Sequence, residues 1–176
     1  MALLLLALEE PLFAGHTLGI WGEALVGANY LQGESMAGFS PGGELGLGWW
    51  VHHNFGLRAR VGLENLSLKS ESVEYYWQAW RATGEAAVRL LSEDRRLLPY
   101  FGGFGGYAWE FSGVRVEDGT GRDLDSLRQF PVYGGFVGLM VRMKMYQMLI
   151  CELGGGAWSG DMIGYLRAGY TFKLLW

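Results

Sequence analysis

The chain has 176 residues, of which 50% are hydrophobic and 15% aromatic but only 18% charged, whereas ordinary soluble domains carry about 25% charged residues. No stretch approaches the roughly 18 to 20 consecutive apolar residues that a membrane-spanning helix requires, so a helical membrane protein is excluded. The net charge of −4 and the lack of any Lys or Arg run argue against a nucleic-acid-binding protein, and the single cysteine excludes an internal disulfide.

The N-terminal segment, residues 1–15, combines a short apolar run from Met1 to Leu8 with two acidic residues, Glu9 and Glu10. We expect this segment to be the remnant of a signal peptide, although it lacks the basic residues that begin such peptides. An N-terminal tail without regular structure is the alternative. Residues 16–176 are expected to form a single domain, because no linker divides them.

Alternation of apolar and polar residues with a period of two predicts eight β-strands, separated by clusters of Gly, Pro, Asn, Asp and Ser. The predicted strands are 16–30, 43–52, 57–68, 75–91, 98–111, 129–143, 146–158 and 163–176. Glycine recurs in almost all of them and costs about 1 kcal/mol in a helix interior, so helices are not expected. Tight turns such as 53–56 alternate with longer connections, of which 31–42 and 112–128 are expected to be long polar loops.

The charged residues of the predicted strands share one face, opposite the apolar residues. The third predicted strand, for example, sets Val61 against Arg58 and Arg60. The predicted polar face of all eight strands carries a nearly balanced set of acids and bases: Glu23, Glu44, Glu64, Glu85, Glu110, Glu152, Arg58, Arg60, Arg81, Arg89, Arg142, Arg167 and Lys173. A buried charge is costly unless it is paired, so this balance is typical of an interior ion-pair network.

Parity alone does not decide which face points inward, because a soluble lipocalin-like barrel would place the same charges outside. Three features favour an inward polar face: glycines in place of small polar residues, balanced charges, and aromatic residues gathered near strand ends like interfacial girdles. The sequence therefore predicts an all-β fold, an eight-stranded antiparallel up-and-down transmembrane β-barrel. Four apolar residues on the polar face, Phe136, Met140, Met148 and Ile150, indicate either a bulge or an apolar plug layer.

The last predicted strand resembles the C-terminal signature of bacterial outer-membrane barrels, which end in an aromatic residue preceded by apolar residues at every second position. The matching positions are Tyr170, Phe172, Leu174 and Trp176. Residues 98–107 are similar to the Pro-Tyr-x-Gly-x-Gly-x-Gly run of small OmpA-, OmpX-, OmpW- and NspA-like barrels, with Phe104 in place of a glycine. The resemblance covers residues 16–176. It implies a location in the bacterial outer membrane and recognition of the C-terminal signature by the barrel-assembly machinery.

The resemblance and the charged interior predict a non-enzymatic integral outer-membrane protein that supports envelope integrity or interacts with surfaces through its extracellular loops. A narrow channel or transporter for small or apolar solutes is the alternative. A lipid-modifying enzyme would need a histidine near the outer rim, but His16, His52 and His53 fall at the opposite, periplasmic ends of their strands. Outer-membrane lipids or lipopolysaccharide are the expected partners, and no cofactor is expected.

The predicted loop 112–128 contains three aspartates, Asp118, Asp123 and Asp125, whose carboxylates could surround a Ca²⁺ or another divalent cation. The spacing of an EF-hand is absent, and a solvated acidic loop is the commoner arrangement. The same loop could contact an extracellular ligand, because exposed loops on rigid scaffolds often carry binding residues.

Overall fold

The computed structural model describes residues 19–32, 37–69, 73–91, 95–117, 120–123, 128–144, 146–158 and 161–175. The N-terminal segment 1–15, for which a signal-peptide remnant was predicted, lies outside the described residues. The strands are β1 (Gly19–Gln32), β2 (Ala37–His52), β3 (Phe55–Lys69), β4 (Val73–Arg89), β5 (Leu97–Glu117), β6 (Thr120–Asp123), β7 (Gln129–Lys144), β8 (Gln147–Trp158) and β9 (Asp161–Leu175). Among the described residues, no helix has the length and apolar character needed to cross a membrane.

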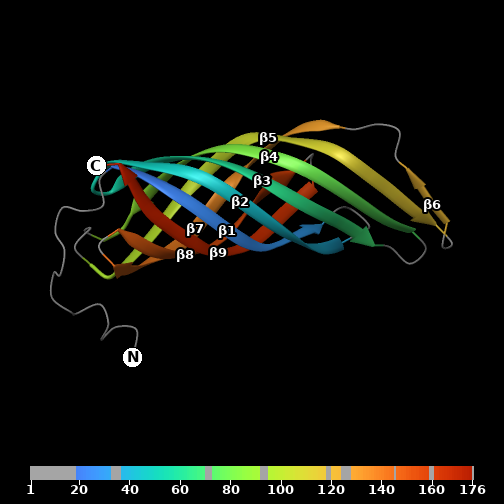
Figure 1. Cartoon of the computed structure of the whole chain (residues 1–176). Helices are drawn as coiled ribbons and strands as arrows, with labels where there is room; N and C mark the ends of the chain where they lie inside the picture. Colours follow the sequence, from blue (N-terminus) through green and yellow to red (C-terminus); the bar gives the residue numbers. More distant parts are fainter. Residues whose placement is uncertain are drawn as a thin grey trace, which may run out of the picture.

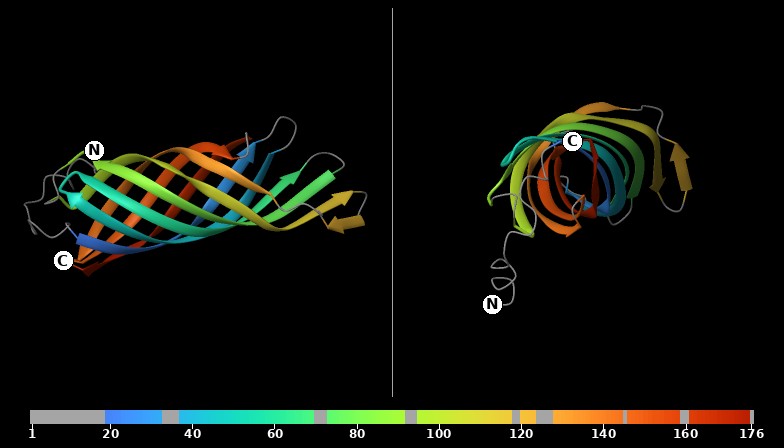
Figure 2. Two further views of the ribbon diagram at one scale, coloured as in Figure 1. Left: turned by 90° about the horizontal axis from the view of Figure 1, so that it is seen from above. Right: turned by 60° about the vertical axis from the view of Figure 1, so that its left-hand side comes forward.

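Eight of these strands close into one antiparallel barrel (Figure 1). Each strand pairs with its neighbours along the chain, β5 pairs directly with β7, and β9 pairs back with β1. The short strand β6 pairs with β5 and stands outside the ring when the barrel is viewed near its axis (Figure 2). The predicted eight-stranded antiparallel up-and-down fold is therefore confirmed.

The two ends of the barrel differ. One end, here called the short-turn end, holds the first residue of β1, the last residues of β9 and the turn His53–Asn54. The opposite end, here called the hairpin end, holds the β5–β6 hairpin, which extends farther than the neighbouring strands (Figure 1). The two described ends of the barrel sequence, at Gly19 and Leu175, thus lie together at the short-turn end.

Two long polar loops were predicted, and both predictions were wrong in part. The first, 31–42, is mostly strand, because β1 continues to Gln32 and β2 begins at Ala37. Hydrogen bonds to β1 outweigh the low strand propensity of glycine and proline in this stretch. The second, 112–128, is partly a hairpin, since β5 continues to Glu117 and pairs with β6.

Side chains alternate between the centre of the barrel and its outer surface. Val26 and Leu45 are 71% and 70% exposed on the outside, whereas Arg60 and Glu152 are 1% and 0% exposed in the centre. Many other large apolar residues are also exposed on the outer surface of the barrel, far beyond the small apolar patches of ordinary soluble monomers. The orientation predicted from the sequence, with charges inside and apolar residues outside, is the one that the structure shows.

The four apolar residues on the polar face are buried in the centre: Phe136, Met140, Met148 and Ile150. The pairing of β7 with β8 is regular along these positions, with its one irregularity between Arg142 and Lys144. The residues pack with Trp21 and Leu98 in a single apolar cluster. Of the two predicted explanations, the structure therefore favours an apolar plug.

Candidate functional site

A first charged cluster in the barrel centre joins two arginines to three glutamates and a tyrosine: Arg58, Arg60, Glu23, Glu85, Glu152 and Tyr100. Arg60 lies between Glu23 at 2.8 Å and Glu152 at 2.5 Å. Arg58 contacts Glu152 at 2.6 Å and Glu85 at 2.8 Å. Strands β1, β3, β4, β5 and β8 supply these residues, so the cluster ties distant parts of the wall together.

A second charged cluster lies beside the first and joins Arg81, Arg167, Glu44, Glu64, Asn29 and Tyr165. Arg167 contacts Glu44 at 2.9 Å and Glu64 at 3.2 Å, while Arg81 also pairs with both carboxylates. The Asn29 amide donates to Glu64. The Arg167 guanidinium lies 3.9 Å from the centre of the Tyr165 ring.

The other predicted interior charges lie apart from these clusters. Glu110 is at the hairpin end, where Arg128 Nε contacts its carboxylate at 3.3 Å. Arg89 stacks over Trp50 towards the short-turn end, with 3.4 Å between its guanidinium carbon and the ring centre. Arg142 is buried and Lys173 half-buried, both near the short-turn end. The interior thus holds two compact ion-pair clusters, with further charged residues towards its two ends.

Glycines on the inner face leave room for these long side chains, as the sequence suggested. A Cβ atom at Gly138 would lie 2.5 Å from the Tyr100 ring, and one at Gly46 would lie 2.7 Å from Cγ of Arg60. Both separations are too short for real atoms. An eight-stranded barrel is just wide enough to be filled by its own side chains, so these glycines allow the charged clusters to fit.

Apolar side chains fill the lumen on both sides of the charged clusters. Trp21, Trp50 and Leu98 pack towards the short-turn end with the four residues of the plug. A separate cluster lies towards the hairpin end: Ala79, Ala108, Phe130, Val132, Trp158 and Ile163. Tyr75 and Trp77 pack against this second cluster and stack on each other, with ring centres 5.4 Å apart.

The predicted cation-binding aspartates are placed only in part. Asp123 ends β6, is exposed and faces Val114 across the hairpin, while Asp118 and Asp125 lie outside the described residues. Among the described residues, no group of three or more His, Cys, Asp and Glu side chains could hold a metal ion. A cation site in this region stays a prediction.

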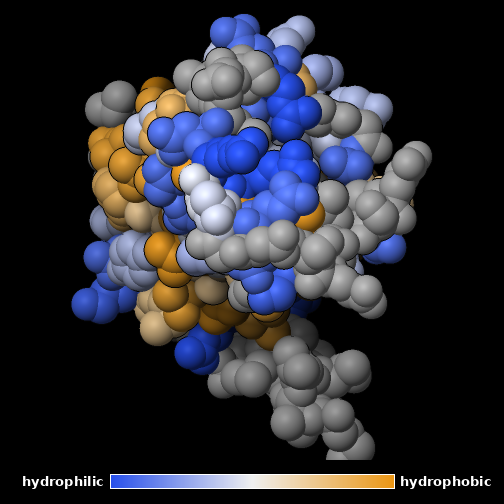
Figure 3. All heavy atoms as spheres, turned by 90° about the vertical axis from the view of Figure 1, so that its right-hand side faces the viewer, coloured by the Kyte–Doolittle hydropathy of each residue, from blue (hydrophilic) through white to orange (hydrophobic). Residues whose placement is uncertain are grey.

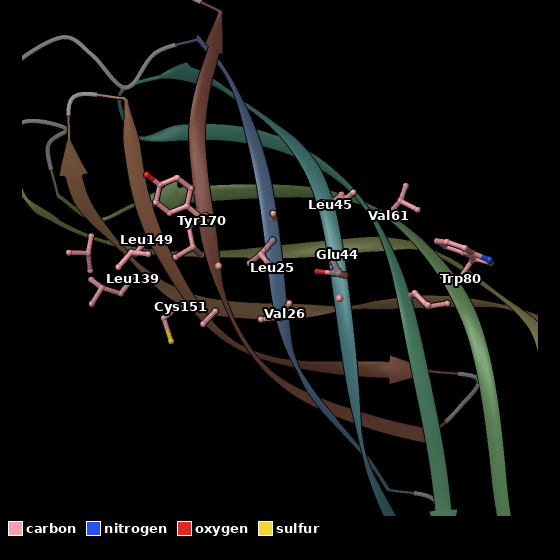
Figure 4. Close-up of a pocket in the computed structure, with 17 residues that line it drawn as sticks. Leu25, Val26, Glu44, Leu45, Val61, Trp80, Leu139, Leu149, Cys151 and Tyr170 are labelled. Atoms are coloured by element: carbon pink, nitrogen blue, oxygen red, sulfur yellow. The ribbon is translucent and has the colours of Figure 1, made fainter.

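An apolar hollow of about 900 Å³ lies on the outer surface (Figure 4). Leu139, Leu149 and Cys151 reach it from one side of β1, and Val61 and Trp80 reach it from the other. These side chains belong to the outward-facing set. The surface of the hollow is almost entirely apolar.

A closed barrel with an apolar outer surface and a charged, filled centre is the architecture of transmembrane β-barrels. The chain has the fold of the small bacterial outer-membrane barrels. Neisserial surface protein A is 14% identical, with 89% of this chain and 97% of that chain covered and a TM-score of 0.67. OprG from Pseudomonas aeruginosa is 10% identical, with 92% of this chain and 100% of that chain covered and a TM-score of 0.61.

The attachment invasion locus protein Ail of Yersinia pestis is also similar, at 10% identity, with 88% of this chain and 99% of that chain covered and a TM-score of 0.54. At such low identities the likeness concerns the fold alone. No protein-family model and no curated protein matches the sequence.

Several interior residues were missed by the sequence reasoning, namely Asn29, Tyr100 and Tyr165. Each shares the parity of a charged residue on its own strand, so the alternation that identified the glutamates and arginines could also have found them. Of the predicted assembly signal, Phe172 and Leu174 are exposed on the outer face of β9 and Tyr170 is half-buried, while Trp176 lies outside the described residues.

Proposed function

We propose that the protein is a non-enzymatic, integral barrel of the bacterial outer membrane that presents its hairpin end outside the cell, supporting surface interaction or envelope integrity. The observation that carries the proposal is the filled lumen, in which two charged clusters lie between two apolar clusters. A lumen filled in this way suits a rigid support better than a conduit. The hairpin is then a part of the molecule that is available to a partner outside the cell.

The arrangement of turns and the outer surface support this orientation. Outer-membrane barrels have short periplasmic turns and longer extracellular segments, so the short-turn end belongs in the periplasm. The apolar outer surface belongs in contact with outer-membrane lipids or lipopolysaccharide. The alternating side chains of β9, from Tyr170 to Leu174, support recognition by the barrel-assembly machinery, with Trp176 completing the proposed signal.

Conductance across a planar lipid bilayer tests the sealed lumen. Refolded wild-type protein is expected to give no stepwise current. The matched comparison is the double variant Trp21→Ala and Met148→Ala, which removes two fully buried side chains of the apolar cluster that contains the plug. Stepwise currents from the wild-type protein would instead favour the narrow channel or transporter.

Labelling of the single cysteine tests membrane insertion. Cys151 lies on the outward face of β8 and is exposed in the isolated chain. In lipid vesicles, a water-soluble maleimide is expected to miss Cys151 and to react with it after unfolding in denaturant. A Thr120→Cys variant in a Cys151→Ser background should react in both states, because Thr120 lies on the exposed hairpin. Rapid labelling of Cys151 in folded, vesicle-bound protein would contradict insertion.

A further inference from the structure

One face of the β5–β6 hairpin concentrates positive charge around a small polar hollow. Arg115 and Arg122 are direct partners across the hairpin, as are Glu117 and Thr120, so all four side chains share that face. They line a hollow of about 280 Å³. Hydrophilic residues gather over this end of the molecule (Figure 3). A hollow of this size suits a small chemical group.

The two arginines face each other without an anion that balances both. Like charges directly opposite each other destabilise a strand pair. Glu117 contacts Arg115 at 2.8 Å, and no ion pair joins Arg122 to another described residue. Two arginines and one glutamate leave this face with a net positive charge. An anion bridging the arginines would therefore relieve the repulsion.

Packing holds the Arg115 guanidinium in place. Its central carbon lies 5.7 Å from the centre of the Tyr75 ring, and Tyr75 stacks on Trp77 with ring planes only 6° apart. Because these rings also pack against the apolar cluster at the hairpin end, the barrel itself supports the arginine. A donor fixed before binding loses less conformational entropy when a ligand arrives.

Two buried donors in this stack have no acceptor. Arg115 Nε and Trp77 Nε1 make no hydrogen bond within the described part of the chain. Of the two residues only Arg115 lines the hollow, and its Nε–H can only donate, so a group that enters the hollow would have to be an acceptor. Phosphate and sulfate present several acceptor oxygens and match the fork of a guanidinium, which binds them through two parallel hydrogen bonds.

We propose that Arg115 and Arg122 bind a phosphate or sulfate group carried on a larger molecule, with Thr120 as an additional donor. The proposal deepens the proposed function and rests on it, since it names the chemistry that the surface-exposed hairpin recognises. Two sources carry this chemistry at a cell surface. One is the phosphorylated headgroup of lipopolysaccharide, and the other is a soluble sulfated glycan.

Calorimetric titration of the refolded protein distinguishes these sources. One arm uses a sulfated disaccharide and its unsulfated parent in zwitterionic detergent. The other arm measures binding of protein in zwitterionic bicelles to lipopolysaccharide and to its dephosphorylated form. Binding that needs the sulfate in the first arm assigns the site to a glycan, and binding that needs the phosphate in the second assigns it to a lipid headgroup. Either result supports the proposal.

Four variants show whether the hairpin arginines are responsible. Arg115→Ala and Arg122→Ala are each expected to weaken binding by about tenfold or more, the range for a lost hydrogen bond to a charged group. Arg128→Ala removes the same charge at the same end, where its partner is Glu110, and is expected to change affinity less than twofold. Arg115→Lys should restore only part of the affinity, because an ammonium lacks the fork.

Absence of binding to both probes, or equal weakening by Arg128→Ala and by the two hairpin variants, would overturn the proposed anion site. If Cys151 stays protected in vesicles while neither probe binds, the anion site fails and the proposed membrane function stands. If Cys151 is labelled in the folded protein, the failure lies in the proposed function.

Discussion

Replacing Glu152 with alanine tests whether the barrel depends on its paired interior charges. The Glu152 side chain is completely buried and accepts hydrogen bonds from Arg58 at 2.6 Å, Arg60 at 2.5 Å and Tyr100 at 2.6 Å. Removing one partner of a buried ion pair costs about 3–5 kcal/mol, because the other charge remains buried without compensation. Since Arg58 keeps Glu85 and Arg60 keeps Glu23, we expect a loss of about 3 kcal/mol, the lower end of that range.

The measurement is urea unfolding of protein refolded in lipid vesicles, followed by tryptophan fluorescence. The matched control is Glu74→Ala, which removes an exposed ion pair with Lys69 and should lower the free energy of unfolding far less than Glu152→Ala does. Glu152→Gln keeps a hydrogen-bond acceptor and should fall between the two. Equal free energies of unfolding for Glu152→Ala and Glu74→Ala would refute the dependence of the interior on ion pairing.

Two further predictions concern the inner glycines and the outer surface. Gly138→Ala should lower the free energy of unfolding by about 1–3 kcal/mol, because its Cβ would overlap Tyr100. Gly105→Ala should leave the free energy of unfolding unchanged, because its Cβ would meet no atom within 4 Å. Equal losses of unfolding free energy in the two variants would count against a tightly packed interior. Val61→Arg should lower the free energy of unfolding in vesicles by about 2–4 kcal/mol in the same urea assay. Val51 lies beside the turn at the short-turn end, so Val51→Arg should lower it by at most about 1 kcal/mol. A smaller cost at Val61 than at Val51 would contradict the placement of the hydrocarbon layer.

Alternation along the chain was sufficient to predict the barrel, because a period of two is a local property of each strand. The parity of Arg58, Arg60 and Glu64 on β3 already placed three charges on one face. The partners of those charges were beyond local reasoning. Arg60 and Glu152 are 92 residues apart, and their contact depends on the width of the closed barrel and on the stagger of its strands.

The β5–β6 hairpin was not predicted, because the stretch 112–128 is long and polar, which is typical of a loop. The dipeptide Asp118-Gly119, preceded by Val114 and Val116 at alternate positions, is typical of a two-residue hairpin connection. A two-residue connection at this dipeptide places Arg115 opposite Arg122, as the structure shows. The strand ends around Gln32 and Ala37 were harder to predict, because hydrogen bonding to a neighbouring strand determines them more than local composition does.

The long separations between paired charges also bear on how the protein folds. Arg167 and Glu64 are 103 residues apart, on strands that come within reach only when the sheet curls and β9 meets β1. A half-assembled sheet in hydrocarbon would therefore expose guanidinium and carboxylate groups that have not yet met. Such intermediates are unfavourable, so insertion and closing of the seam should occur as one all-or-none event, guided at the edge strands where the seam forms.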